Sequence, residues 1–114
     1  MISITVYRNQ KEEYLGFDCL GHAGYADSGE DVVCAGVSAL VLNTINTIAC
    51  FTGEKFTTDT DEDTGKILVK FEQPAGHDAE LMMKSLVLGL QGIQNNYGVD
   101  YVTLNSKEIG RAHV

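Results

Sequence analysis

The sequence has little proline, few basic residues and few cysteines, and each shortage excludes a class of protein. Its 114 residues include one proline, twelve glycines and 44% hydrophobic residues, a composition that excludes a disordered or collagen-like chain. Eight basic residues stand against sixteen acidic ones, for a net charge of −8. Because an acidic surface repels phosphate backbones, we expect no direct binding to nucleic acid. Basic peptides or basic proteins are better matched as partners.

The three cysteines are Cys19, Cys34 and Cys50. Their odd number and the lack of a Cys-x-x-Cys pair argue against a disulfide framework and a structural zinc site. The N-terminus lacks the basic stretch and apolar run of a signal peptide. The longest nearly apolar stretch covers eleven residues, 32–42, which is too short to cross a bilayer. We therefore expect a reduced, cytoplasmic protein with no membrane partner, metal or cofactor.

Periodicity predicts five strands and two helices. Residues 2–7 alternate as a strand does, and a second alternation places Leu15, Phe17 and Cys19 on one face, so the two should form an antiparallel hairpin. We expect another hairpin from residues 55–60 and 66–71, and a last strand over 99–104. Helical spacing predicts helices over 32–50 and 79–97. The order β-β-α-β-β-α-β indicates one α+β domain over residues 1–114, with a single mixed or antiparallel sheet and two helices.

The first predicted helix is so rich in apolar residues that we expect it to be buried on most sides. Asp31 is a suitable N-cap for it, which would place Cys34 in its first turn. Cys19 follows the buried parity of its strand. Cys50 lies sixteen residues beyond Cys34, about 24 Å along the helix axis. We expect Cys19 and Cys50 to be structural, buried thiols, neither of them placed to pair with Cys34.

The residues best suited to chemistry are His22, where a strand ends, and Cys34, where a helix begins. A free thiol is a weak nucleophile at neutral pH because little of it is thiolate. A helix N-terminus and a neighbouring imidazolium both stabilise thiolate and lower a thiol's pKa. Eleven residues separate the two, enough for the loop to bring His22 back to the helix. The plainer alternative is a small buried cysteine and a histidine in an ordinary polar contact.

The run from Gly21 to Leu40, GHAGYADSGEDVVCAGVSAL, resembles the signature of the Prp family, the ribosomal-processing cysteine proteases of Firmicutes and related bacteria. The resemblance implies a peptide-bond hydrolase with His22 as base and Cys34 as nucleophile. It also implies a small homodimer that acts in ribosome assembly. Its substrate would be the N-terminal extension of a large-subunit ribosomal protein, the twenty-seventh by the usual count, cut after an aromatic-rich segment.

Two further residues could support this pair. Asp31 would orient His22 or only cap the helix. Ser38, one helical turn after Cys34, would line the site or hydrogen-bond back to a backbone carbonyl. Backbone N–H groups at the helix start are the expected oxyanion donors, because they have no partner within the helix.

The segment between the two elements is expected to form a substrate loop. Gly21 would end the strand and re-aim the following side chain. Gly24 and Gly29 would let the loop close over a bound peptide. Tyr25 would pack against an aromatic substrate side chain or simply lie on the surface.

Two other functions remain open at this point. The protein could be a non-catalytic assembly factor that binds a basic ribosomal protein, with Cys34 as a plain core residue. It could also be a thiol redox sensor, which is disfavoured because no resolving cysteine is expected within reach of Cys34.

Overall fold

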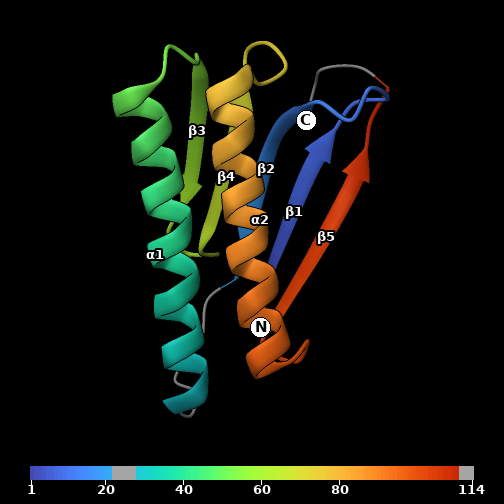
Figure 1. The fold of residues 1–114 in the computed structure, drawn as a ribbon. Helices are drawn as coiled ribbons and strands as arrows, with labels where there is room; N and C mark the ends of the chain where they lie inside the picture. The colour runs from blue at the N-terminus through green and yellow to red at the C-terminus, as the bar shows by residue number, and fades with distance from the viewer. Residues whose placement is uncertain (22–27, 111–114) are drawn as a thin grey trace.

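The computed structural model describes residues 1–21 and 28–110. Both helices lie on the same face of one sheet, so the molecule has two layers (Figure 1). The element order confirms the predicted α+β fold: β1 (Ile2–Arg8), β2 (Tyr14–Leu20), α1 (Ser28–Phe51), β3 (Phe56–Asp61), β4 (Lys66–Phe71), α2 (His77–Tyr97) and β5 (Val102–Glu108).

The five strands are arranged in the order β3-β4-β2-β1-β5. Both predicted hairpins are antiparallel, and β2 pairs with β4 to join them. β5 adds to the edge parallel to β1, with Ile2 beside Val102, which makes the sheet mixed. Cys19 lies between Ile4 on β1 and Ile67 on β4, on the face that the helices cover.

The last strand begins three residues later than the predicted Val99. Helix α2 ends at Gly98, which has a φ of 101°, and the N–H of Tyr101 donates to the carbonyl of Gly98 at 3.2 Å. This turn occupies the residues that were expected to start the strand. The chain can pair with β1 only after the turn is complete, so β5 starts at Val102.

A β-bulge changes which residues of β2 enter the core. Tyr7 pairs with Gly16 but Arg8 pairs with Tyr14, so Leu15 is the extra residue. Tyr14 joins the main core together with Phe17 and Cys19, while Leu15 is buried outside that cluster. The expectation that Leu15 shares the core face is wrong, because a bulge shifts the alternation of side chains by one.

Helix α1 begins at Ser28, four residues before the predicted start. The pattern Ser28-x-x-Asp31 before an apolar run is typical of a helix N-terminus, and this signal could have located the start. Residue 31 therefore lies within the first turn, so its predicted role as the N-cap is wrong. Residue 29 lies in the helix, so its predicted place in a loop is wrong too.

Helix α1 is buried on one face rather than on most sides. Val33, Val37, Val41 and Ile48 are in the core, but Val32 is 54% exposed and Leu42 is 50% exposed. The residues of the outer face are mostly small or uncharged, so the helix as a whole has a high mean hydropathy. The twenty residues from Val32 to Phe51 have a mean hydropathy of 1.8, long and apolar enough by length and composition to cross a membrane. In this structure the helix instead buries one face through Val33, Val37, Val41 and Ile48, while Phe51 is 82% exposed.

Candidate active site

Cys34 is the seventh residue of α1 and is half-buried. The helix start lies about 9 Å away along the axis, at 1.5 Å per residue. The expected position in the first turn is therefore wrong. The N–H groups without helical partners belong to the first four residues, about a turn from Cys34. These N–H groups therefore do not lie beside the Cys34 thiol, where oxyanion donors were expected.

Cys34 lines a cavity of about 160 Å³ between α1 and the lower part of the sheet. Two successive turns of α1 form one wall: Cys34, Val37, Ser38, Val41 and Leu42. The opposite wall comes from β1, β2, β4 and adjoining turns: Ile2, Cys19, Gly21, Gly65 and Ile67. Ser38 therefore lines the same cavity as Cys34.

Among the residues whose side chains the structure describes, 1–21 and 32–110, the lining carries no charged residue and Ser38 supplies its only hydroxyl. An apolar cavity of about 150 Å³ is large enough to admit a benzene ring. This cavity can therefore hold one apolar side chain of a bound peptide next to the Cys34 thiol.

Gly21 ends β2 and lies on this cavity, as the sequence predicted for the end of the strand. Its φ is +95°, and a Cβ placed there would lie 2.5 Å from the carbonyl oxygen of Met1. Its N–H donates to the carbonyl of Thr64 at 3.2 Å. Glycine is required here because only it adopts this conformation without strain. The next residues of the predicted site, His22, Gly24 and Tyr25, and the side chain of Asp31 lie outside the described part of the chain.

Cys19 is a residue that the sequence analysis assigned only to the core. It is buried on β2, yet it lines the same cavity as Cys34. Burial and, to a smaller extent, the charges of Asp18 and Cys34 together raise the pKa of its thiol to about 11. The sequence analysis did not anticipate that Cys19 and Cys34 line one cavity. The alternation of side chains along a strand predicts that a residue is buried. It does not predict which helix residue packs over it.

Cys50 differs from the other two thiols. It is exposed, in the last turn of α1. The expectation that it is a buried structural residue is wrong, because α1 presents this position to solvent and not to the sheet.

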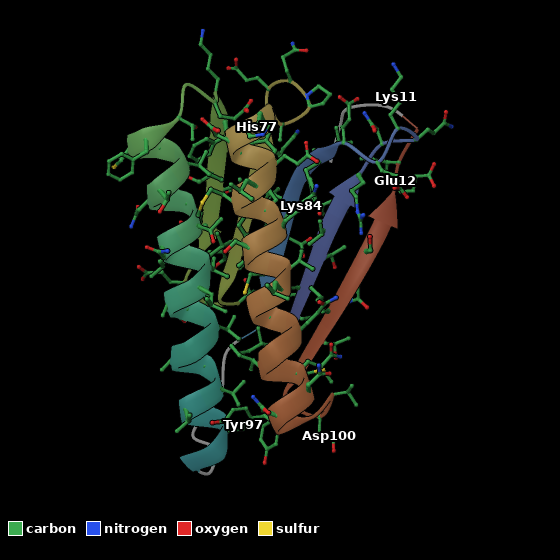
Figure 2. All side chains as sticks on the ribbon, in the orientation of Figure 1. Lys11, Glu12, His77, Lys84, Tyr97 and Asp100 are labelled. Carbon is green, nitrogen blue, oxygen red and sulfur yellow. The ribbon has the colours of Figure 1, made fainter. Side chains whose placement is uncertain are left out.

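A larger hollow of about 270 Å³ lies at the opposite end of the helices, between residues 52–54 and 76–79. Figure 2 labels His77 at this end of α2. The His77 side chain is 93% exposed, and its Nδ1 lies 3.1 Å from Asp78 Oδ1. No cysteine or serine lines this hollow. Within residues 1–21 and 28–110, no three His, Cys, Asp or Glu side chains gather as metal ligands. The cavity at Cys34 is therefore the better candidate site.

A half-buried thiol at the wall of a cavity, on a small two-layer α+β fold, gives this chain a place for thiol chemistry, so the class of protein that the site points to is a thiol-dependent enzyme. The profile of the family described as "Cysteine protease Prp" matches residues 1–103, and the chain belongs to this family. It is a cysteine protease.

Its relatives include proteins of known name and structure. The ribosomal processing cysteine protease Prp of Bacillus subtilis (strain 168) is 32% identical over 101 residues, which are 85% of this chain and 90% of the relative. Two solved structures of the S. aureus Prp protease cover 94% of this chain and 100% of their own. One holds a covalently linked product peptide (27% identity, TM-score 0.84) and the other a substrate peptide (26% identity, TM-score 0.86).

Proposed function

We propose that this protease removes the N-terminal extension of a basic large-subunit ribosomal protein, the twenty-seventh by the usual count, during ribosome assembly. The names of its relatives and the peptides bound to the S. aureus protease support this substrate class. The observation that carries the proposal is the half-buried thiol of Cys34 at an apolar cavity. The opposite wall of that cavity includes Gly21, the residue that precedes His22.

In the proposed mechanism, His22 accepts the thiol proton as the sulfur of Cys34 attacks the scissile carbonyl carbon. The tetrahedral intermediate collapses when His22 returns the proton to the leaving amine, and an acyl-enzyme remains. A water deprotonated by His22 then attacks the thioester carbon and releases the second product. Asp31 is the proposed positioning residue for His22, because it lies three positions before Cys34, a spacing that places the two residues on one side of α1.

The surroundings of the site suit an uncharged side chain on a basic protein. The cavity would hold the apolar side chain, while the net charge of −8 attracts the basic remainder of the substrate. This attraction weakens with added salt. We propose the cytoplasm as the compartment, since its reducing conditions keep the three thiols free.

We also propose that the protein is a homodimer that uses the outer face of α1. Val32, Ala35, Ala39 and Leu42 are exposed, and their spacing of three and four residues places them along one stripe. No charged residue interrupts the sequence between Val32 and Gly53. A second copy of this helix would cover a stripe that is otherwise exposed to water.

The nucleophile is tested by comparing Cys34→Ala with Cys50→Ala. Each variant is incubated with the N-terminally extended ribosomal protein, and cleavage and binding are measured separately by mass spectrometry and by titration. Cys34→Ala should fold, bind and cut nothing, because alanine is a good helix former and no other group forms the acyl intermediate. Cys50→Ala should cut like the wild type. Cleavage by Cys34→Ala would show that the nucleophile is assigned wrongly.

The base is tested in the same assay with His22→Ala. Turnover should stop or become very slow, since only spontaneously formed thiolate remains. Wild type that binds the extended protein and never cuts it would favour a non-catalytic assembly factor for this substrate.

A further inference from the structure

The cavity at the site carries two thiols, and only one of them is needed for the proposed chemistry. Cys34 reaches it from α1 and Cys19 from β2. The two elements are consecutive in the chain and contribute to opposite walls of this space. The third cysteine, Cys50, lies about 24 Å from Cys34 along the helix axis and belongs to neither wall.

The structure leaves room for the two sulfurs to approach. The space between the walls is about 160 Å³, and both cysteines line it. Cys19 is held rigidly between two neighbouring strands. Cys34 lies only one turn beyond the first turn of α1, where helices open most readily. A disulfide needs Cα atoms within about 7 Å, and any closing movement would come from this end of α1.

The charge state of Cys34 affects the pKa of Cys19. The charge of Cys34 is one of the causes that raise the pKa of Cys19. Oxidation that leaves Cys34 neutral removes that cause, and Cys19 then ionises more easily. Burial, the largest cause, remains, so the pKa of Cys19 falls only in part.

We propose that Cys19 is a resolving cysteine for Cys34, so that oxidation by a hydroperoxide closes an intramolecular disulfide and reversibly switches the protease off. The thiolate of Cys34 attacks the peroxide, the O–O bond breaks, and Cys34 becomes a sulfenic acid as an alcohol or water leaves. The thiolate of Cys19 then attacks that sulfur, the S–O bond breaks, and hydroxide leaves as water. Two thiols are oxidised and one peroxide is reduced.

The disulfide would protect the enzyme as well as inhibit it. A sulfenic acid left unresolved is oxidised further to a sulfinic acid, which ordinary thiols do not reduce. A disulfide is reduced by thiol exchange. The inference rests on the proposed role of Cys34 as nucleophile, since an unreactive thiol would not meet the peroxide first.

The test compares wild type, Cys19→Val and Cys50→Ser after graded treatment with hydrogen peroxide. Wild type should lose about 2 Da, the mass of two hydrogens, and a non-reducing digest should contain a peptide linking residues 19 and 34. Cleavage activity should fall with this product and return with dithiothreitol. Cys50→Ser should behave as wild type. Cys19→Val should instead gain about 32 Da at Cys34, with activity that dithiothreitol does not restore.

Each variant is compared with its own untreated activity, and Cys19→Ala replaces Cys19→Val if the larger side chain prevents folding. The inference is overturned if wild type forms no 19–34 link and reaches the sulfinic acid at the same peroxide dose as the Cys19 variant. A link confined to Cys50 of two chains would overturn it as well. An untreated wild type that cleaves nothing would instead refute the proposed function, because the mass readout needs no substrate.

Discussion

At the scale of single residues, the three cysteines occupy three different environments. Cys19 is buried in β2, Cys34 is half-buried at the cavity, and Cys50 is exposed at the end of α1. A thiol reacts through its thiolate, so both access and ionisation decide its rate. Cys19 is poor in both respects, with a pKa raised to about 11 by burial, Asp18 and Cys34. Cys50 serves as an internal reference for an ordinary accessible thiol.

Alkylation should therefore order the three thiols. With iodoacetamide at about pH 6–7, below the ordinary thiol pKa, we expect Cys34 to react first, Cys50 more slowly and Cys19 last. His22→Ala should slow the labelling of Cys34 and leave that of Cys50 unchanged, because only Cys34 depends on the imidazole. Peptide-resolved mass spectrometry over time measures all three rates. An unchanged rate at Cys34 in His22→Ala would contradict the proposed pair.

Gly21 connects β2 to the predicted base, and its conformation should be irreplaceable. Gly21→Ala should lower the free energy of unfolding by about 1–3 kcal/mol, because it forces a side chain into the left-handed region and toward the Met1 carbonyl. Gly92→Ala is the matched control, since nothing lies within 4 Å of a Cβ there. That change should stabilise α2 by about 0.5–1 kcal/mol. Urea unfolding gives both values, and equal stability of the two variants would refute this account of Gly21.

At the scale of elements, the two helices differ on their outer faces. The outer face of α2 carries charge, including the ion pair of Lys84 with Glu80 at 3.0 Å. The outer face of α1 carries the exposed stripe from Val32 to Leu42 and no charge after Asp31. Large exposed apolar surfaces mark interaction sites more often than free surfaces do. This difference is the reason for assigning the proposed dimer contact to α1.

A charge placed in that stripe should separate the subunits. Ala39→Glu should weaken the dimer by about tenfold or more, because the interface would bury an unpaired carboxylate. Leu88→Glu on α2, where the leucine is 71% exposed, should leave the oligomeric state unchanged. Sedimentation velocity over a range of protein concentrations measures both. A monomeric wild type, or dissociation by Leu88→Glu alone, would be inconsistent with a dimer through α1.

At the scale of the whole molecule, two weak acids are held in their neutral form by the fold. The pKa of Cys19 rises from 9.0 to about 11. The pKa of Tyr7 rises from 10.0 to about 12, through burial, its hydrogen bond to Asp18 Oδ2 at 2.6 Å, and the charge of that carboxylate. In both cases the folded chain keeps a proton that the unfolded chain releases. Their contribution to stability is complete below pH 9 and is lost as pH rises through the folded values.

Stability should therefore fall steadily between pH 9 and 12. Cys19→Val should flatten the lower part of this fall, and Tyr7→Phe the upper part, because each removes one titrating group. Urea midpoints at several alkaline pH values give the slopes. Slopes identical to that of wild type in both variants would show that other groups control the alkaline transition.

The local patterns of the chain determined most of the strands and helices. They also indicated His22 and Cys34 as the pair of residues to test. The alternation in residues 2–7, the helical spacing in residues 79–97 and the two hairpins depend on neighbours along the chain, and each is observed. The run from Gly21 to Leu40 indicated the Prp family, whose profile matches residues 1–103. Short-range periodicity carries this information because a strand or helix sorts its own side chains by face.

The tertiary structure decided the features that depend on which elements pack together. The parallel pairing with β1 set the start of β5, whereas the α1 start at Ser28, which moved Cys34 out of the first turn, has a local signal in Ser28-x-x-Asp31. Above all, packing of α1 on the sheet brought Cys19 to the cavity of Cys34 while leaving Cys50 exposed. Parity assigns a thiol to a face, but only the docking of the helix on that face determines which thiols meet.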